Sequence, residues 1–162
     1  MKIKGIITAM VTPLSENGIN EKATRKLVNK LIDSGIHGLF ILGTNGEFYA
    51  LSEEEKLELV KIVVDEVDGR VPVFAGSGGI STEAVIKLTN QFAALGVDAV
   101  SVITPYFITP ADEEILQHDQ NVANSVQIPI ILYNIPKNTG CNISKEVLRE
   151  LTKLPNVLGI KD

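Results

Sequence analysis

The chain alternates short, nearly uninterrupted apolar runs with longer segments of helical period, and this rhythm restricts its fold more than any other feature. The runs are rich in Val, Ile, Leu, Phe and Ala and hold few charges, which is typical of parallel strands covered on both faces. They are Ile3–Val11, Gly38–Leu42, Val71–Ala75, Ala99–Ile103, Pro129–Tyr133 and Val157–Ile160. The sequence therefore predicts an α/β fold built on a parallel sheet.

The segments between the runs are amphipathic and carry signals that begin and end helices. Ser52 with Glu55 matches a capping box, and Gly35 and Gly96 stand where a left-handed residue ends a helix. Asn20, Ser81 and Ser144 are further N-cap candidates. The predicted helices are Glu21–Ser34, Glu53–Asp68, Thr82–Leu95, Ala111–Ser125 and Lys145–Thr152. This pattern indicates consecutive βα units, in either an open doubly wound sheet or a (β/α)8 barrel.

The chain stops directly after the sixth run, at Asp162, and no helix follows to cover that strand. A (β/α)8 barrel typically needs about 250 residues, whereas this chain has 162. Six strands alone would leave the first and last as exposed apolar edges, which favour association with another chain. We therefore expect either a fragment of a barrel or a fold completed by elements from elsewhere.

Composition excludes several classes of function. The formal net charge is −5, and Lys and Arg form no basic stripe, so we expect neither nucleic acid nor an anionic membrane as a partner. No run approaches the roughly 20 apolar residues that span a bilayer, and we interpret the apolar start as a strand rather than a signal peptide. The single cysteine, Cys141, forms no internal disulfide, which favours a cytoplasmic protein.

Functional side chains of parallel α/β folds gather at the carboxyl ends of the strands, and Lys161 stands at such an end. Desolvation there would lower its pKa and make the amine a nucleophile toward a carbonyl. Tyr133 ends the preceding strand, about 4.8 Å away in a parallel sheet, from where its phenol could transfer protons. A solvated lysine and a rim tyrosine would look the same in sequence, so position alone leaves both interpretations open.

Other strand ends carry weaker signals. The run Gly43-Thr44-Asn45-Gly46-Glu47 offers backbone N–H groups and a hydroxyl that suit a carboxylate, although a tight turn would look alike. The run Gly76-Ser77-Gly78-Gly79 lacks the ending of a phosphate-binding loop, so we interpret it as a plain turn. His37, His118 and Cys141 have no neighbours at metal-ligand spacing, and we predict no metal site.

Taken together, the strand ends resemble the dihydrodipicolinate synthase/N-acetylneuraminate lyase family. The resemblance rests on Gly43–Glu47, on Tyr133–Pro136 with Thr139-Gly140, and on Gly159–Asp162, in matching order along the chain. It implies that residues 1–162 are the N-terminal part of one (β/α)8 barrel domain, usually found in a homotetramer. It also implies a lyase or aldolase acting on pyruvate or another 2-oxo acid without metal or organic cofactor.

By the same resemblance, Lys161 is the Schiff-base lysine and Tyr133 the proton-transferring phenol. Thr44 is a third catalytic residue, and Thr44 and Asn45 bind the oxo-acid carboxylate. Two positions depart from dihydrodipicolinate synthase itself, which has a tyrosine where this chain has Phe107 and an arginine where it has Asn138. Neither replacement can relay a proton or form a charged fork. We therefore expect a hydroxy-oxo-acid or sugar-acid aldolase. The alternatives are dihydrodipicolinate synthase proper, a non-catalytic barrel fragment and a doubly wound binding protein.

Overall fold

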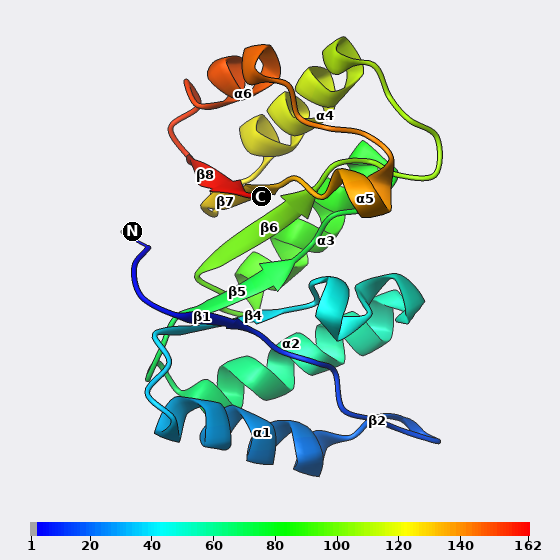
Figure 1. The fold of residues 1–162 in the computed structure, drawn as a ribbon. Coiled ribbons are helices and arrows are strands. Elements are labelled where there is room, and N and C mark those ends of the chain that lie inside the picture. The colour runs from blue at the N-terminus through cyan, green and yellow to red at the C-terminus, as the bar shows by residue number, and fades with distance from the viewer. Residues whose placement is uncertain (1–2) are drawn as a thin grey trace. The chain divides into compact units, whose positions relative to one another are not determined.

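The computed structural model describes residues 3–162 as strands and helices in alternation (Figure 1). The residues fall into two compact units. The first unit runs to Gly76 and includes Gln91–Asp98, and the second consists of Ser77–Asn90 and Ala99–Asp162. Each unit is an α/β arrangement with its own parallel strands.

In the first unit, three parallel strands lie in the order β1 (Ile7–Ala9), β4 (Gly38–Ile41) and β5 (Val73–Gly76). Every residue of β4 and β5 is buried, as their continuous apolar sequences predict. A small antiparallel hairpin, β2 (Leu14–Ser15) with β3 (Gly18–Ile19), follows β1. Two single turns of 3-10 helix follow β4, namely η1 (Thr44–Gly46) and η2 (Phe48–Ala50).

Two helices of the first unit, α1 (Glu21–Asp33) and α2 (Glu53–Val67), begin at the caps that the sequence predicts. Asn20 caps α1, and Ser52 and Glu55 form both hydrogen bonds of a capping box on α2. Arg25 of α1 lies within 2.8 Å of carboxylate oxygens on its own helix and on α2; they belong to Glu21, Asp65 and Glu66. These ion pairs connect the polar faces of the two helices.

In the second unit, three parallel strands lie in the order β6 (Ala99–Ile103), β7 (Ile130–Tyr133) and β8 (Val157–Lys161). The helices are α4 (Asp112–Ser125), α6 (Lys145–Leu151) and the single turn α5 (Pro136–Thr139), together with the part of α3 (Thr82–Ala94) that precedes Gln91. The carboxyl end of β8 lies beside that of β7 (Figure 1). The strand–helix order of the sequence analysis is thus confirmed.

The structure corrects the sequence prediction at the start of the chain. A strand was expected over Ile3–Val11, but β1 covers only Ile7–Ala9. Gly5 has a φ of +84°, a left-handed conformation that is incompatible with an extended strand. The β2–β3 hairpin, the two 3-10 turns and α5 were not predicted, because segments this short have no detectable period.

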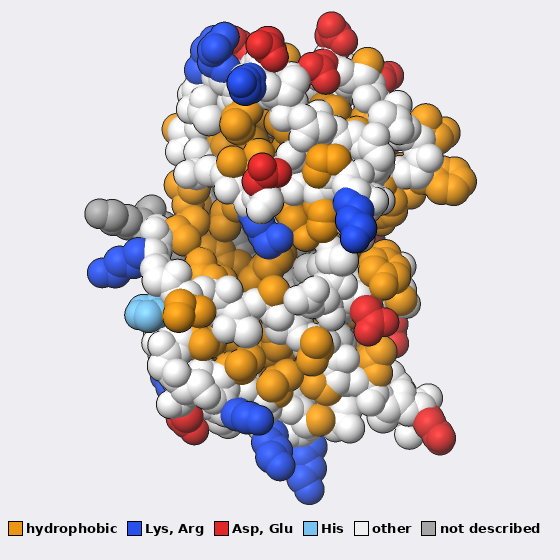
Figure 2. Space-filling model, viewed as in Figure 1, with side chains coloured by type: hydrophobic (Ala, Val, Ile, Leu, Met, Phe, Trp, Pro, Cys, Tyr) orange, Lys and Arg blue, Asp and Glu red, His pale blue; other side chains and the backbone are white. Residues whose placement is uncertain are grey.

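The outermost strand of each unit is less covered than its sequence predicts. All three residues of β1 are half-buried, and β8 shows Leu158 and Ile160 at 36% and 37% exposure. The prediction that β8 is covered on both faces is therefore wrong, while the prediction of exposed apolar edges is confirmed. Hydrophobic side chains are also visible at the surface in Figure 2.

Over the described range 3–162, no helix has both the length and the apolar character needed to cross a membrane.

Candidate active site

Tyr133 and Lys161 are paired residues at the carboxyl ends of the parallel strands β7 and β8. The Lys161 Nζ lies 3.7 Å from the centroid of the Tyr133 ring, over its face. Tyr133 is 6% exposed, so the surrounding residues hold its ring in place, and the amine packs against the ring. The expectation that adjacent strands bring the amine and the aromatic side chain together is confirmed, and their chemical roles stay a prediction.

Lys161 differs from its expected environment in one respect. The sequence analysis places it in a packed wall where desolvation acts on the amine, but the residue is exposed in this structure. The reason is the position of β8, which pairs with β7 on one side and has no second strand partner among residues 3–162. The expectation of a desolvated Lys161 is therefore wrong for the chain as it stands.

The predicted carboxylate-binding residues, Thr44 and Asn45, belong to the first unit and open the 3-10 turn η1. Thr44 is half-buried and Asn45 is exposed. A hydrogen bond of 2.7 Å, which the Thr12 hydroxyl donates to the Gly46 carbonyl, holds the turn in place. The structure thus gives the loop a defined shape, while its role in substrate binding stays a prediction.

The glycine-rich turn after β5 has a structural explanation. A Cβ on Gly76 would lie 2.1 Å from the Leu42 carbonyl oxygen, and one on Gly78 would lie 2.6 Å from the Ile103 amide nitrogen. Both positions therefore need glycine so that another stretch of backbone can approach. Close approach accounts for these two glycines without a phosphate ligand, in agreement with our interpretation of a plain turn.

The two histidines and the cysteine each have polar neighbours of their own. The Nδ1 of His37 accepts a hydrogen bond from the Ile6 amide at 3.1 Å, and the Nδ1 of His118 lies 2.8 Å from the Thr82 hydroxyl. Cys141 is buried, with its Sγ 3.4 Å from the Pro105 carbonyl oxygen. Within residues 3–162, no group of three or more His, Cys, Asp or Glu side chains is arranged to hold a metal ion.

Two residues of the second unit were expected to affect the choice of substrate. Phe107 has a φ of +82° and is 89% exposed, so its ring projects away from the core. Asn138 lies on α5, in the loop that follows Tyr133, and is also exposed. Both are accessible to a ligand or to another protein surface.

Two buried polar residues of the second unit lie outside the set of predicted site residues. Asn134, directly after Tyr133, forms side-chain hydrogen bonds with three other residues. Asp119 on α4 is 4% exposed, and its Oδ2 has no hydrogen-bond partner. Burial raises the pKa of Asp119 to about 7. A carboxylate on the apolar stripe of a predicted helix, four residues after Ile115, is the signal that could have revealed it.

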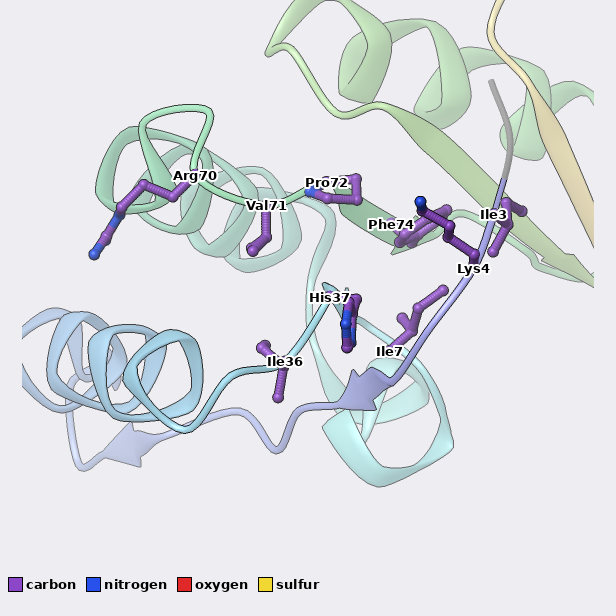
Figure 3. Close-up of a pocket in the computed structure, with 9 residues that line it drawn as sticks. All are labelled: Ile3, Lys4, Ile7, Ile36, His37, Arg70, Val71, Pro72 and Phe74. Carbon is purple, nitrogen blue, oxygen red and sulfur yellow. The ribbon is translucent and has the colours of Figure 1, made fainter.

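A cavity of about 390 Å³ lies at the opposite, amino ends of the strands in the first unit (Figure 3). It is mostly apolar, with Ile7 and Phe74 among its walls, and Lys4 and His37 are polar members. Figure 3 shows the Arg70 guanidinium pointing away from the other labelled residues, and it donates to the Asn29 side chain and the Glu66 carbonyl. Because parallel α/β enzymes place their chemistry at the carboxyl ends, this cavity is not the candidate active site.

Comparison with known proteins decides the family. The Dihydrodipicolinate synthetase family profile matches residues 2–162. This chain belongs to that family. A 4-hydroxy-tetrahydrodipicolinate synthase of Phenylobacterium zucineum is 42% identical over 159 residues, which are 98% of this chain and 54% of the relative.

Solved structures of the family agree with this assignment. A dihydrodipicolinate synthase of Bacillus anthracis is 43% identical with a TM-score of 0.95, over 100% of this chain and 56% of the other. A chloride-inhibited dihydrodipicolinate synthase of Acinetobacter baumannii, complexed with pyruvate, is 38% identical with a TM-score of 0.96, over 99% and 56% of the two chains.

The family assignment confirms the predicted fold class. The chain is α/β, and its six parallel strands with their helices correspond to the first six strands of a (β/α)8 barrel. Members of the Dihydrodipicolinate synthetase family are class I aldolases and lyases. The chain spans about half the length of the curated relatives that it matches.

Proposed function

We propose that this protein is a lyase of the aldolase type that binds pyruvate or a related 2-oxo acid as a Schiff base on Lys161, with Tyr133 as the proton-transferring group. The observation that carries the proposal is the 3.7 Å approach of the Lys161 Nζ to the Tyr133 ring at paired strand ends. The family assignment supports it, because class I aldolases form such adducts. We also propose that residues 1–162 form the N-terminal part of a single barrel domain.

The proposed reaction begins when the neutral Lys161 amine adds to the C2 carbonyl of the oxo acid. A proton moves from nitrogen to oxygen to give the neutral carbinolamine, and a second proton, donated to its hydroxyl by Tyr133, lets water leave and an iminium ion form. Loss of a C3 proton then gives an enamine, whose carbon can attack an aldehyde, and the reverse sequence cleaves the same bond. Tyr133 would donate and accept the protons of these steps. The iminium is itself the electron sink, so the proposal requires no metal or organic cofactor.

The carboxylate of the oxo acid needs hydrogen-bond donors, and we propose that Thr44 and Asn45 provide them. The hydroxyl of Thr44 and the amide of Asn45 are both donors, and η1 holds both residues in one defined turn. A Thr44→Val substitution tests the assignment, because it keeps the shape of the side chain and removes the hydroxyl. We expect the pyruvate concentration for half-maximal adduct formation to rise about tenfold, as for one lost hydrogen bond to a charged group.

Reduction with borohydride in the presence of pyruvate tests the central proposal. We expect intact-mass analysis to show one reduced pyruvate adduct, and peptide mapping to place it on Lys161. Lys161→Arg should abolish the adduct, while Lys145→Arg, at an exposed lysine of the same unit, should leave it unchanged. A folded chain that forms no adduct would support the alternative of a non-catalytic barrel fragment.

The second substrate separates two candidate activities. The names of the relatives favour dihydrodipicolinate synthase proper, which joins pyruvate to aspartate semialdehyde. Phe107 and Asn138 favour a hydroxy-oxo-acid or sugar-acid aldolase, because neither can supply the hydroxyl relay or the charged fork expected of the synthase. Turnover of aspartate semialdehyde with pyruvate should therefore be much slower than cleavage of hydroxy-oxo acids. Comparable rates would contradict this preference.

The assembly and location of the protein complete the proposal. We propose a homo-oligomer, with a homotetramer as the expectation from the family resemblance, and a cytoplasmic location. The family resemblance supports the assembly, and the single cysteine fits a reducing compartment. Sedimentation of the purified protein tests the assembly, and fractionation of the source cells tests the location.

A further inference from the structure

Asn134 uses its side chain to connect three other residues of the second unit. Its Nδ2 donates hydrogen bonds to the Oδ1 of Asn142 at 2.7 Å and to the Oδ1 of Asp162 at 2.8 Å. Its Oδ1 accepts a hydrogen bond from the Ile143 amide at 3.0 Å. Asn134 is 6% exposed, and the bond from the buried Ile143 forms where water competes little, whereas Asn142 and Asp162 are exposed. Both amide protons and the carbonyl are thereby engaged.

The first connection leads to the strand that carries Lys161. The backbone amide of Asn134 donates to the Lys161 carbonyl at 2.9 Å, and its side chain reaches Asp162, the next residue. The residue that directly follows β7 therefore contacts both the peptide group of Lys161 and the side chain of Asp162. These contacts extend the pairing of β8 with β7, which runs as far as Tyr133 and Lys161, by one residue on each strand.

The second connection leads to the loop after β7. This loop contains the turn α5 and returns to Asn134 through Asn142 and Ile143. Within it, the Thr139 hydroxyl lies 3.2 and 3.0 Å from the Ile135 and Cys141 carbonyl oxygens, which share its one proton. The loop is therefore a closed structure whose base is the Asn134 side chain.

We infer that Asn134 is a positioning residue, which holds the α5 loop and the end of β8 together and so sets the place of the Lys161 amine against Tyr133. The inference rests on the proposed Schiff-base function of Lys161. Its hydrogen bonds run to the Lys161 carbonyl, to Asp162 and to the α5 loop, so it acts on the amine through these neighbours. Its side chain hydrogen-bonds to both segments.

The side-chain chemistry at this position is specific. A carboxylate in place of the amide could accept from Ile143, but it could not donate to Asn142 or Asp162. It would also face the Asp162 carboxylate at hydrogen-bond distance, where two like charges repel. The Asn134→Asp substitution therefore keeps the shape of the side chain and replaces the attractive contact with Asp162 by a repulsive one.

Reciprocal exchange tests the inference directly. In the double variant Asn134→Asp with Asp162→Asn, the amide at 162 donates to the carboxylate at 134, so the β8 contact returns with its direction reversed. Asp162→Ala is a milder variant that removes only the β8 acceptor at an exposed position. Asn156→Asp is the matched control, because Asn156 donates to the Ala123 and Val126 carbonyls near the other end of β8.

Two measurements are made on each variant. The first is the rate of borohydride-trapped adduct formation at saturating pyruvate, together with the half-saturating concentration. The second, without pyruvate, is the rate of Lys161 acetylation by a limiting anhydride relative to Lys145, read by peptide mass spectrometry. Circular dichroism and urea unfolding verify that each variant is folded.

We expect Asn134→Asp to slow adduct formation at saturation about tenfold or more and to change the acetylation ratio, as for loss of a hydrogen bond to a charged group. Asp162→Ala should have a smaller effect in the same direction, and the double variant should return to within about threefold of the parent. Asn156→Asp should leave both measurements unchanged even where it lowers stability.

A folded Asn134→Asp protein with the parent's trapping rate and acetylation ratio would overturn the inference. So would a folded double variant that recovers neither measurement. If the parent forms no adduct, the proposed function fails. The acetylation ratios of the variants then still decide whether Asn134 positions Lys161, so the two failures are distinguishable.

Discussion

The Nζ of Lys161 lies over the face of the Tyr133 ring, 3.7 Å from its centroid, and the two residues are register partners on adjacent parallel strands. The strand pairing therefore sets their separation, and the ring face attracts the ammonium group. In the proposed function, Tyr133 makes two separate contributions. Its ring places the amine, and its hydroxyl would transfer protons to and from the carbinolamine oxygen.

Substitution of Tyr133 by Phe separates these contributions. The Tyr133→Phe protein keeps the ring face under Lys161 and loses the hydroxyl, so its fold and the place of the amine should be unchanged. We expect adduct formation with pyruvate to slow about a hundredfold, the usual effect of removing a general acid–base group. The rate is measured by adding borohydride at a series of times after pyruvate and determining the fraction of protein that carries the reduced adduct.

Tyr49 provides the control for that experiment, because it is a tyrosine with 60% exposure in the first unit. Tyr49→Phe should form the adduct at the parent's rate. An unchanged rate in Tyr133→Phe would show that another group, or water, transfers the protons.

Gly76→Ala tests the close backbone approach in the first unit. The added Cβ would lie 2.1 Å from the Leu42 carbonyl oxygen and 2.9 Å from its carbon, and neither atom can rotate away. We expect the free energy of unfolding to fall by about 3 kcal/mol or more, as for severe overpacking. The midpoint of urea unfolding gives the change.

Gly159→Ala is the matched substitution, because a Cβ there meets no atom within 4 Å and the residue does not have a positive φ. It should be neutral or slightly stabilising. Equal urea midpoints for the two variants would show that the backbone near Leu42 moves easily.

The features that the sequence predicts correctly depend on local patterns. The apolar run Ala99–Ile103 matches β6 at both ends, and the Ser52–Glu55 capping box lies within four consecutive residues. A continuous apolar run, a helical period and a cap each act through neighbours in the chain. Such signals suffice for the order of strands and helices and for the proximity of Tyr133 and Lys161.

The features that escape prediction depend on distant partners. The Asn134 side chain forms hydrogen bonds with Asn142 and Asp162, which are 8 and 28 residues away along the chain. No local sequence pattern around Asn134 predicts either contact. The exposure of Lys161 follows from the missing second neighbour of β8 rather than from its own apolar sequence. Burial of Asp119 likewise depends on what packs against α4.

The apolar edge of β8 predicts concentration-dependent association of the 162-residue chain. Leu158 and Ile160 are two positions apart in the strand, so their side chains face the same side. Both side chains are more than a third exposed. Ile160→Lys places a charge on that side and should shift the equilibrium toward monomer. Light scattering after size exclusion, over a range of concentrations, measures the shift.

Ile80→Lys is the control, since Ile80 is 57% exposed but lies in a loop. Its association should equal that of the parent chain. A parent that stays monomeric at every concentration would contradict the edge argument.

Asp119 predicts how stability depends on pH. Burial raises its pKa to about 7, above the unfolded value, so the folded state binds the proton more tightly. The stability that this proton provides is present below about pH 4 and is lost as the pH rises through 7. His118 acts in the opposite direction, because burial lowers its pKa. The pH profile of the parent's unfolding free energy would therefore combine the opposing contributions of Asp119 and His118.

Comparison with Asp119→Leu isolates the carboxyl group, because His118 is present in both proteins. Between pH 5 and pH 8, the parent should lose roughly 2 to 3 kcal/mol of unfolding free energy relative to the variant, from the difference between the folded and unfolded pKa. Glu113→Gln, at an exposed residue of the same helix, should follow the parent profile. Urea unfolding at each pH provides the values. Parallel profiles for the parent and Asp119→Leu would mean that Asp119 is solvated or paired in solution, and that α4 packs less closely there than its 4% exposure indicates.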